Sequence, residues 1–205
     1  MGWSRDFPEH LEEAVRAILD GDRRRAELVM EGLRADAPRL SPARRPSQRR
    51  QLEVYRRDRF HCRYCDRKTV FHPVFQLLGV AFFPGTLPFH PNWRTGLTHP
   101  AIPIFASTVD HVHPVSDGGD PDDPRNLVTA CSECQYQKGQ ARSGWELRPI
   151  VAGGWAGLSD VYERLWNAEQ YAGPLDRGPS HDRWIALLRE PSPAVPDAVP
   201  GGLRR

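Results

Sequence analysis

The sequence predicts an α+β protein whose small core of strands and a helix is held together by metal. Two Cys-x-x-Cys pairs, Cys62/Cys65 and Cys131/Cys134, together offer four thiolates. Between them, the residues from Thr108 to His113 alternate and are rich in β-forming side chains, as in a strand. Helical periodicity is found toward both ends of the chain. We therefore expect a metal-stapled core that helical segments precede and follow.

The composition is that of a soluble globular protein with extensions. The chain has 205 residues, of which 39% are hydrophobic and 26% are charged. The longest mainly apolar stretch, from Val74 to Phe83, is too short to span a bilayer. Arg5, Asp6 and Glu9 interrupt any apolar core of a signal peptide. We expect a cytoplasmic protein with no membrane partner.

The N-terminal segment, residues 1–37, is predicted to be helical. Two apolar faces with helical spacing lie on either side of Gly21, which predicts a helical hairpin or a kinked helix. These faces are Leu11, Ala14, Val15, Ile18 and Ala26, Val29, Met30, Leu33. Three prolines close together then predict a linker at 38–47.

The core is expected to occupy residues 48–150, with an insertion at 69–106. Ser47 can cap a helix that runs to about Asp58. The insertion holds six prolines and several aromatic side chains and shows no clear period, so we expect an irregular segment without regular strands. After a turn at Ser116–Gly119, residues 124–130 fit either a short helix or a return strand. Another short helix is expected at 135–141.

The C-terminal part, residues 151–190, is predicted to be a helical extension. Leu158, Val161, Tyr162 and Leu165 form one apolar helical face, and a last helix is expected from His181 to Arg189. From 191 to 205, Pro, Gly and Ala dominate, which predicts a disordered tail.

The two cysteine pairs match a closed four-cysteine zinc site. Zinc takes four thiolates in a tetrahedron, and the two-residue spacing lets one turn present two sulfurs. No cysteine is left over, and in a reducing compartment this pairing favours metal over disulfides. A closed site of this kind is structural, because it leaves no open coordination position.

Three blocks of sequence resemble the HNH endonuclease family. They are residues 56–65 around the first cysteine pair, residues 109–119 beginning Val-Asp-His, and residues 125–139 from Arg-Asn-Leu to Gln-Lys-Gly. The resemblance implies a ββα-metal core stapled by the zinc site. Around it we expect the N-terminal helical hairpin, the irregular aromatic insertion and the C-terminal helices.

The resemblance also implies roles for individual residues. His111 falls at the general-base position, and Asp110 at that of a ligand to a catalytic divalent ion, such as Mg²⁺. Asn126 would orient the His111 ring or fix its loop. Lys138 falls where the family places a basic residue near the phosphate. Gln135 stands at a metal-ligand position usually held by His or Asn, and its longer side chain departs from the pattern.

A basic run leads into the first cysteine pair. From Arg39 to Lys68 there are eleven Lys or Arg residues against three acids, although the net charge of the whole chain is only +2. The pattern fits phosphate contacts with double-stranded DNA, or an ordinary solvated surface in a chain that uses Arg throughout. The candidate DNA contacts in this run are Arg49, Arg50, Arg56 and Arg57.

Three functions are compatible with these features. The first is a metal-dependent DNA endonuclease with structural Zn²⁺ and catalytic Mg²⁺ or another divalent cation, which the Asp110, His111 and Asn126 pattern favours. The second is a zinc-stabilised protein that binds DNA or a partner without cleaving, which Gln135 favours. The third, a redox protein, is disfavoured because no thioredoxin-like βαβ pattern accompanies the cysteine pairs.

Overall fold

A computed structural model describes residues 7–32, 46–139, 145–150, 152–168 and 179–191. Most of the predicted linker, residues 38–45, lies outside these residues, as does the predicted tail from 192 onward. The division of the chain into domains stays a prediction. Among the described residues, no helix is long and apolar enough to cross a membrane.

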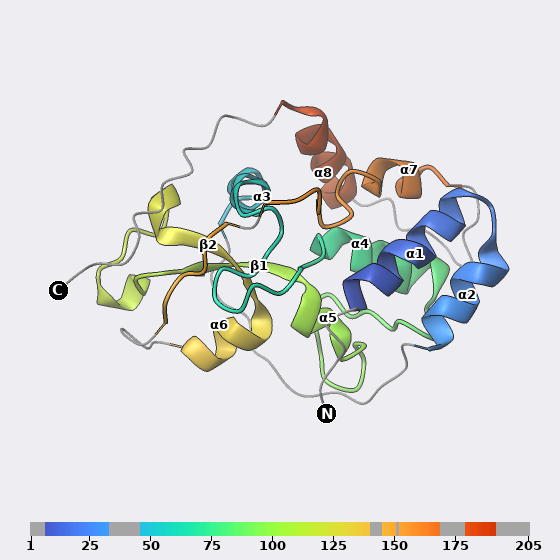
Figure 1. Cartoon of the computed structure of the whole chain (residues 1–205), viewed down its shortest axis with the longest axis horizontal. Coiled ribbons are helices and arrows are strands. Elements are labelled where there is room, and N and C mark those ends of the chain that lie inside the picture. Colours follow the sequence, from blue (N-terminus) through green and yellow to red (C-terminus); the bar gives the residue numbers. More distant parts are fainter. Residues whose placement is uncertain (1–6, 33–45, 140–144, 151, 169–178, 192–205) are drawn as a thin grey trace.

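The centre of the fold is a β-hairpin followed directly by a short helix. Strand β1 (Ser107–His111) pairs antiparallel with β2 (Leu127–Cys131), with Asp110 opposite Val128. Helix α6 (Ser132–Lys138) begins at the residue after β2 and packs against both strands. This order gives the predicted ββα arrangement and confirms the α+β fold class. Figure 1 shows α6 on one side of the hairpin and α3 on the other.

The loop between the two strands contains two 3₁₀ turns, η2 (Val115–Asp117) and η3 (Pro124–Asn126). Gly118 follows the first turn with a φ of +90°, a conformation that glycine adopts without steric cost. The region predicted as either a helix or a return strand therefore contains both, because a single 3₁₀ turn leads into β2.

Helix α3 (Gln48–Arg57) covers the hairpin face opposite α6 and contacts both strands. The Ser47 side chain accepts a hydrogen bond from the backbone N–H of Arg50, which satisfies one of the free donors at the helix start. The predicted cap and helix are confirmed. The helix ends at Arg57, and Asp58, its C-cap, leads toward the first cysteine pair.

Helices α1 (Phe7–Leu19) and α2 (Arg23–Glu31) form the predicted hairpin. Gly21 turns the chain with a φ of +82°, and the Asp22 side chain caps α2 by accepting from Arg25 N–H. The predicted apolar face of α1 is fully buried, and Phe7 at its start packs on the rings of Phe75 and Phe105 from the insertion. The helical hairpin of α1 and α2 lies away from the strands (Figure 1), and its buried residues belong to the main hydrophobic core.

The insertion at 69–106 is more regular than predicted. It contains α4 (His72–Leu77), a π-helical turn η1 (Leu78–Phe82) and α5 (Ala101–Phe105). The expected absence of regular strands holds among its residues, all of which the structure describes. Gly79 lets the following loop approach closely, since a Cβ there would lie 2.4 Å from the Leu87 carbonyl oxygen. The helices are too short for their periodicity to show in the sequence.

The C-terminal part adds α7 (Tyr162–Trp166) and α8 (Pro179–Arg189). The last predicted helix, His181 to Arg189, is confirmed. The predicted face from Leu158 to Leu165 is helical only from Tyr162, because Leu158 has a φ of +63°. Tyr162 and Trp184 meet the ring of Phe71 edge-on, at centroid distances of 5.4 and 5.0 Å. One aromatic cluster thus joins the C-terminal helices to the start of the insertion.

Candidate functional site

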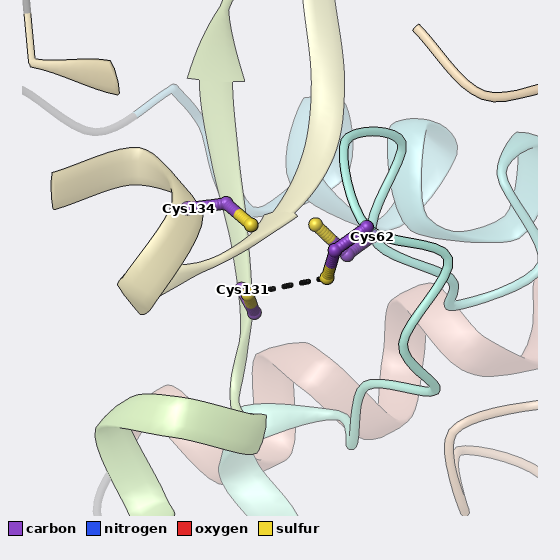
Figure 2. Close-up of side chains that lie close together, drawn as sticks. Cys62, Cys131 and Cys134 are labelled. Atoms are coloured by element: carbon purple, nitrogen blue, oxygen red, sulfur yellow. Dashed lines mark hydrogen bonds between the residues drawn. The ribbon is translucent and has the colours of Figure 1, made fainter. Parts of the chain in front are cut away.

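The four cysteines converge from two distant parts of the chain. Cys62 and Cys65 lie in the loop after α3, Cys131 ends β2 and Cys134 lies in α6. All four are free thiols, and their sulfur atoms lie within 4.8 Å of one another. Figure 2 shows the side chains of Cys62, Cys131 and Cys134 pointing toward a common centre.

This geometry fits zinc. Zn–S bonds of about 2.3 Å in a tetrahedron place sulfur atoms about 3.8 Å apart, and the sulfurs of Cys65 and Cys131 are 3.9 Å apart. Hydrogen bonds among the thiols lower the pKa of Cys65 and raise that of Cys131. The cluster is thus in position to bind zinc as predicted. Within the described part of the chain, no other group of three or more His, Cys, Asp or Glu side chains is placed to hold an ion.

The Arg67 guanidinium lies beside the cluster. It is 3.9 Å from the Cys131 sulfur and donates a 2.7 Å hydrogen bond to the Glu133 carboxylate. Four thiolates around Zn²⁺ carry a net charge of −2, so a neighbouring cation stabilises the loaded site. The backbone N–H of Cys62 donates to the Arg67 carbonyl, which closes the first cysteine loop.

Asp110 lies on the hairpin face that meets α6. Its side chain is only 10% exposed. Its Oδ2 atom accepts a 2.6 Å hydrogen bond from the Tyr64 hydroxyl and lies 3.1 Å from Lys138 Nζ. Burial, together with the charge of Asp110, raises the pKa of Tyr64, so the phenol stays a donor. No hydrogen bond to Oδ1 is found among the described residues, so this oxygen is the candidate ligand atom of the carboxylate.

His111, the next residue on β1, is half-buried and turns to the loop between the strands. Its Nε2 atom is 3.2 Å from the carbonyl oxygen of Pro121. A carbonyl can only accept, so this contact favours the tautomer with hydrogen on Nε2. The other ring nitrogen, Nδ1, then carries a lone pair and can accept a proton.

Asn126 fixes the loop and does not contact the His111 ring directly. Its Oδ1 accepts from the backbone N–H of His113, and its Nδ2 donates to the carbonyl oxygens of His113 and Asp120. These bonds hold both ends of the segment that carries the Pro121 carbonyl. Of the two roles predicted for Asn126, the geometry supports the second, in which it acts on His111 through the loop.

Gln135 in α6 lies against β1. Its Nε2 donates a 3.2 Å hydrogen bond to the Val109 carbonyl. No hydrogen bond to its amide oxygen is found among the described residues, as is the case for Asp110 Oδ1. Carboxylate and amide oxygens are ligands that Mg²⁺ and similar ions accept, with water completing the shell. The donor set therefore fits a divalent ion with a single anionic ligand.

Lys138 is buried, with 2% of its side chain exposed. Its Nζ donates a 2.8 Å hydrogen bond to the His111 carbonyl and pairs with Asp110. The sequence interpretation placed this residue near a phosphate. In this structure it is instead an internal partner of the candidate metal ligand.

The four arginines expected to contact phosphate have intramolecular partners. Arg49 pairs with Glu190 in a bidentate contact, Arg50 pairs with Glu53, and Arg56 donates to the carbonyl oxygens of Leu188 and Glu190 at the end of α8. Burial lowers the pKa of Arg56. Arg49 keeps an exposed side chain and Arg50 a partly exposed one, and both remain candidates for phosphate contacts.

Arg57 has no surface to offer a phosphate, because only 3% of its side chain is exposed. It donates twice to the fully buried carboxylate of Asp58 and also to the carbonyl oxygens of Pro124 and Leu127. Asp58 accepts further bonds from Arg63 and from the backbone N–H of Thr129. This network joins α3, β2 and the first cysteine loop. In this structure Arg57 is therefore bonded within the protein, and its predicted DNA contact stays a prediction.

We predict that Arg57→Ala lowers the free energy of unfolding by about 3 kcal/mol, because it leaves Asp58 buried with one cation fewer. Arg50→Ala is the matched control, because its partly exposed i,i+3 ion pair with Glu53 contributes only about 1 kcal/mol or less. Urea denaturation of the zinc-loaded proteins measures both. Equal stability of the two variants would contradict the structural role.

Sequence reasoning missed two site residues, Tyr64 and Asp58. Nothing local marks Tyr64 as a partner of Asp110, 46 positions away. For Asp58 a signal exists, since it is the one acid in the run from Arg56 to Arg63. A lone carboxylate among arginines at a helix end indicates a buried ion-pair network.

Comparison with known families agrees with this geometry. Residues 101–141, which include both strands and α6, match the family model described as HNH endonuclease. The resemblance stated from the sequence is thus confirmed for this segment, and it supports a nuclease-type function on nucleic acid. The first cysteine pair, Cys62 and Cys65, lies outside the matched residues, and the fold places it next to the second pair, Cys131 and Cys134. Comparisons with curated proteins and with solved structures found no match.

Proposed function

We propose that this chain is a metal-dependent DNA endonuclease of the HNH type that hydrolyses phosphodiester bonds. The observation that carries the proposal is the arrangement on β1. Asp110 faces α6, where its Oδ2 atom contacts Tyr64 and Lys138, and no hydrogen bond to Oδ1 is found among the described residues. The Nε2 atom of the adjacent His111 contacts the Pro121 carbonyl, and Nδ1 has no hydrogen bond among the same residues. A candidate ion ligand and a candidate base thus stand on consecutive residues, inside the segment that matches the family.

In the proposed mechanism, His111 is the general base. Its Nδ1 takes a proton from water, and the hydroxide attacks phosphorus. Pro121 fixes the ring tautomer, and Asn126 holds the loop that presents the Pro121 carbonyl. Asp110 and Gln135 would hold the divalent ion, which when bound would stabilise negative charge on the phosphate and the leaving 3′ oxygen. The products would carry 5′-phosphate and 3′-hydroxyl ends.

In this proposal zinc would be a structural ion and would take no part in the reaction. Tyr64 lies between two of its ligands, Cys62 and Cys65, and donates to Asp110. The zinc site therefore supports the hairpin and also the position of the candidate ion ligand. We propose that the protein works on double-stranded DNA in the cytoplasm, with Arg49 and Arg50 as the remaining candidate phosphate contacts.

The test is cleavage of supercoiled plasmid by zinc-loaded protein. Mg²⁺, Mn²⁺ or Ni²⁺ is added in separate reactions, and one reaction receives EDTA. We expect nicked or linear DNA with the divalent ions and none with EDTA, and end-labelling should find 5′-phosphates. DNA binding without cleavage under every condition would overturn the proposal and favour the second function, a zinc-stabilised binding protein.

The position of Gln135 separates these two functions. If its amide oxygen is a ligand, Gln135→Ala should raise the concentration of divalent ion that gives half-maximal cleavage. Gln135→His should shift the preference toward Mn²⁺ or Ni²⁺, because imidazole suits transition metals better than Mg²⁺. Cleavage rates across a metal titration measure both effects.

Gln137→Ala is the control, because Gln137 is exposed on the same helix. If Gln135→Ala cleaves like wild type at limiting metal, Gln135 is not a ligand. If only Gln135→His cleaves, the natural chain is a degenerate nuclease.

A further inference from the structure

The Lys138 ammonium lies inside the candidate metal site. It is within 3.1 Å of Asp110 Oδ2, donates to the His111 carbonyl at 2.8 Å, and lies 5.9 Å from the centre of the Tyr64 ring. A buried charge is stable only when it is paired and hydrogen-bonded. The three groups around the Lys138 ammonium, namely Asp110, the His111 carbonyl and the Tyr64 ring, belong to β1 or to the first cysteine loop. The site thus already contains a positive charge of its own.

We infer that Lys138 is a resident cation that limits how tightly the Asp110 site holds a divalent ion. This inference rests on the proposed function, in which Asp110 is the anionic ligand. The ammonium and the ion would share one carboxylate, so each reduces the attraction that the other feels. Their mutual repulsion is weakly screened, because the ammonium is buried and the Asp110 side chain is nearly so. Lys138 therefore acts on the ion through Asp110 and is a positioning residue.

Tyr64 provides an internal comparison. Its hydroxyl bonds to the same Oδ2 atom as Lys138 but carries no charge. Removal of the hydroxyl frees one hydrogen-bonding position on the carboxylate and leaves the charge of the site unchanged. Removal of the ammonium frees a position and also makes the site more negative by one unit. If charge is the cause, only the second change strengthens ion binding markedly.

The experiment measures Mn²⁺ binding to the zinc-loaded protein without DNA, from the loss of the free Mn²⁺ EPR signal. Asp110→Asn defines the binding that does not depend on the site. We expect Lys138→Met and Lys138→Gln each to tighten the Asp110-dependent binding by about tenfold or more. Tyr64→Phe should change it less than about threefold. Lys138→Gln keeps a donor for the His111 carbonyl and is the variant better able to fold.

Unchanged or weaker Mn²⁺ affinity in the folded Lys138 variants would overturn the inference and leave the proposed nuclease intact. Loss of zinc and of folding in both variants would also overturn it, because Lys138 would then be a structural ion pair. A similar gain in Tyr64→Phe would show that the free carboxylate position matters and the charge does not. Absence of Asp110-dependent binding in every protein would refute the metal site itself, a result distinct from the other three.

Discussion

Cys131→Ala is expected to abolish soluble folding. Cys131 ends β2 immediately before α6, and its sulfur belongs to the cluster that joins β2 to the loop after α3. Structural zinc binds with apparent free energies of about 10–16 kcal/mol. Whole domains are stable by only about 5–15 kcal/mol. Without the metal, the first cysteine loop and α6 lose the bonds that tie them together, and a two-stranded hairpin is by itself at best marginally stable.

Zinc content, soluble yield and far-UV circular dichroism measure this prediction. Wild type purified without added metal should contain about one zinc per chain, since one cluster of four thiolates holds one ion. The matched control is Ser132→Ala, because the buried Ser132 hydroxyl at the next position has no hydrogen-bond partner among the described residues. The control should keep both zinc and fold. A folded Cys131→Ala protein, or wild type without any thiophilic metal, would contradict the structural role of the site.

The secondary structure near the site could be predicted because its signals are local. The alternation that predicts β1, the Ser47 cap of α3 and the apolar face of α1 each depend on residues a few positions apart. The cysteine pairs also carried long-range information, because zinc requires four ligands and the chain has two pairs of cysteines and no others. The four ligands that zinc requires thus predicted the contact between the two cysteine pairs, which are separated by 65 residues.

The functional assignment of the basic residues could not be predicted in the same way. Charge in a sequence does not show whether a side chain meets solvent, a phosphate or a buried partner. Arg57 and Arg50 look alike in the basic run, but Arg57 lies in the buried Asp58 network and Arg50 is partly exposed. The sequence likewise did not show that Lys138 is buried, because its burial depends on how α6 packs on β1.

His111 is the residue whose replacement should have the largest effect on the reaction. Its Nε2 atom contacts the Pro121 carbonyl, which leaves Nδ1 to take a proton from water. General-base catalysis contributes about 10²–10⁴-fold to the rate of a reaction of this kind. We therefore predict that His111→Ala lowers the single-turnover rate of plasmid cleavage by about that factor. The half-saturating metal concentration should change little, because the ion ligands remain.

The control for this prediction is His113→Ala. His113 is exposed, and Asn126 binds its backbone and leaves its ring uninvolved. This variant should keep the loop, the tautomer of His111 and the wild-type rate. Rapid-quench cleavage with saturating Mn²⁺, followed by a metal titration, compares the three proteins. If His113→Ala loses as much rate as His111→Ala, the base is not unique to His111. If His111→Ala mainly raises the metal requirement, His111 acts as a ligand and the proton must leave by another route.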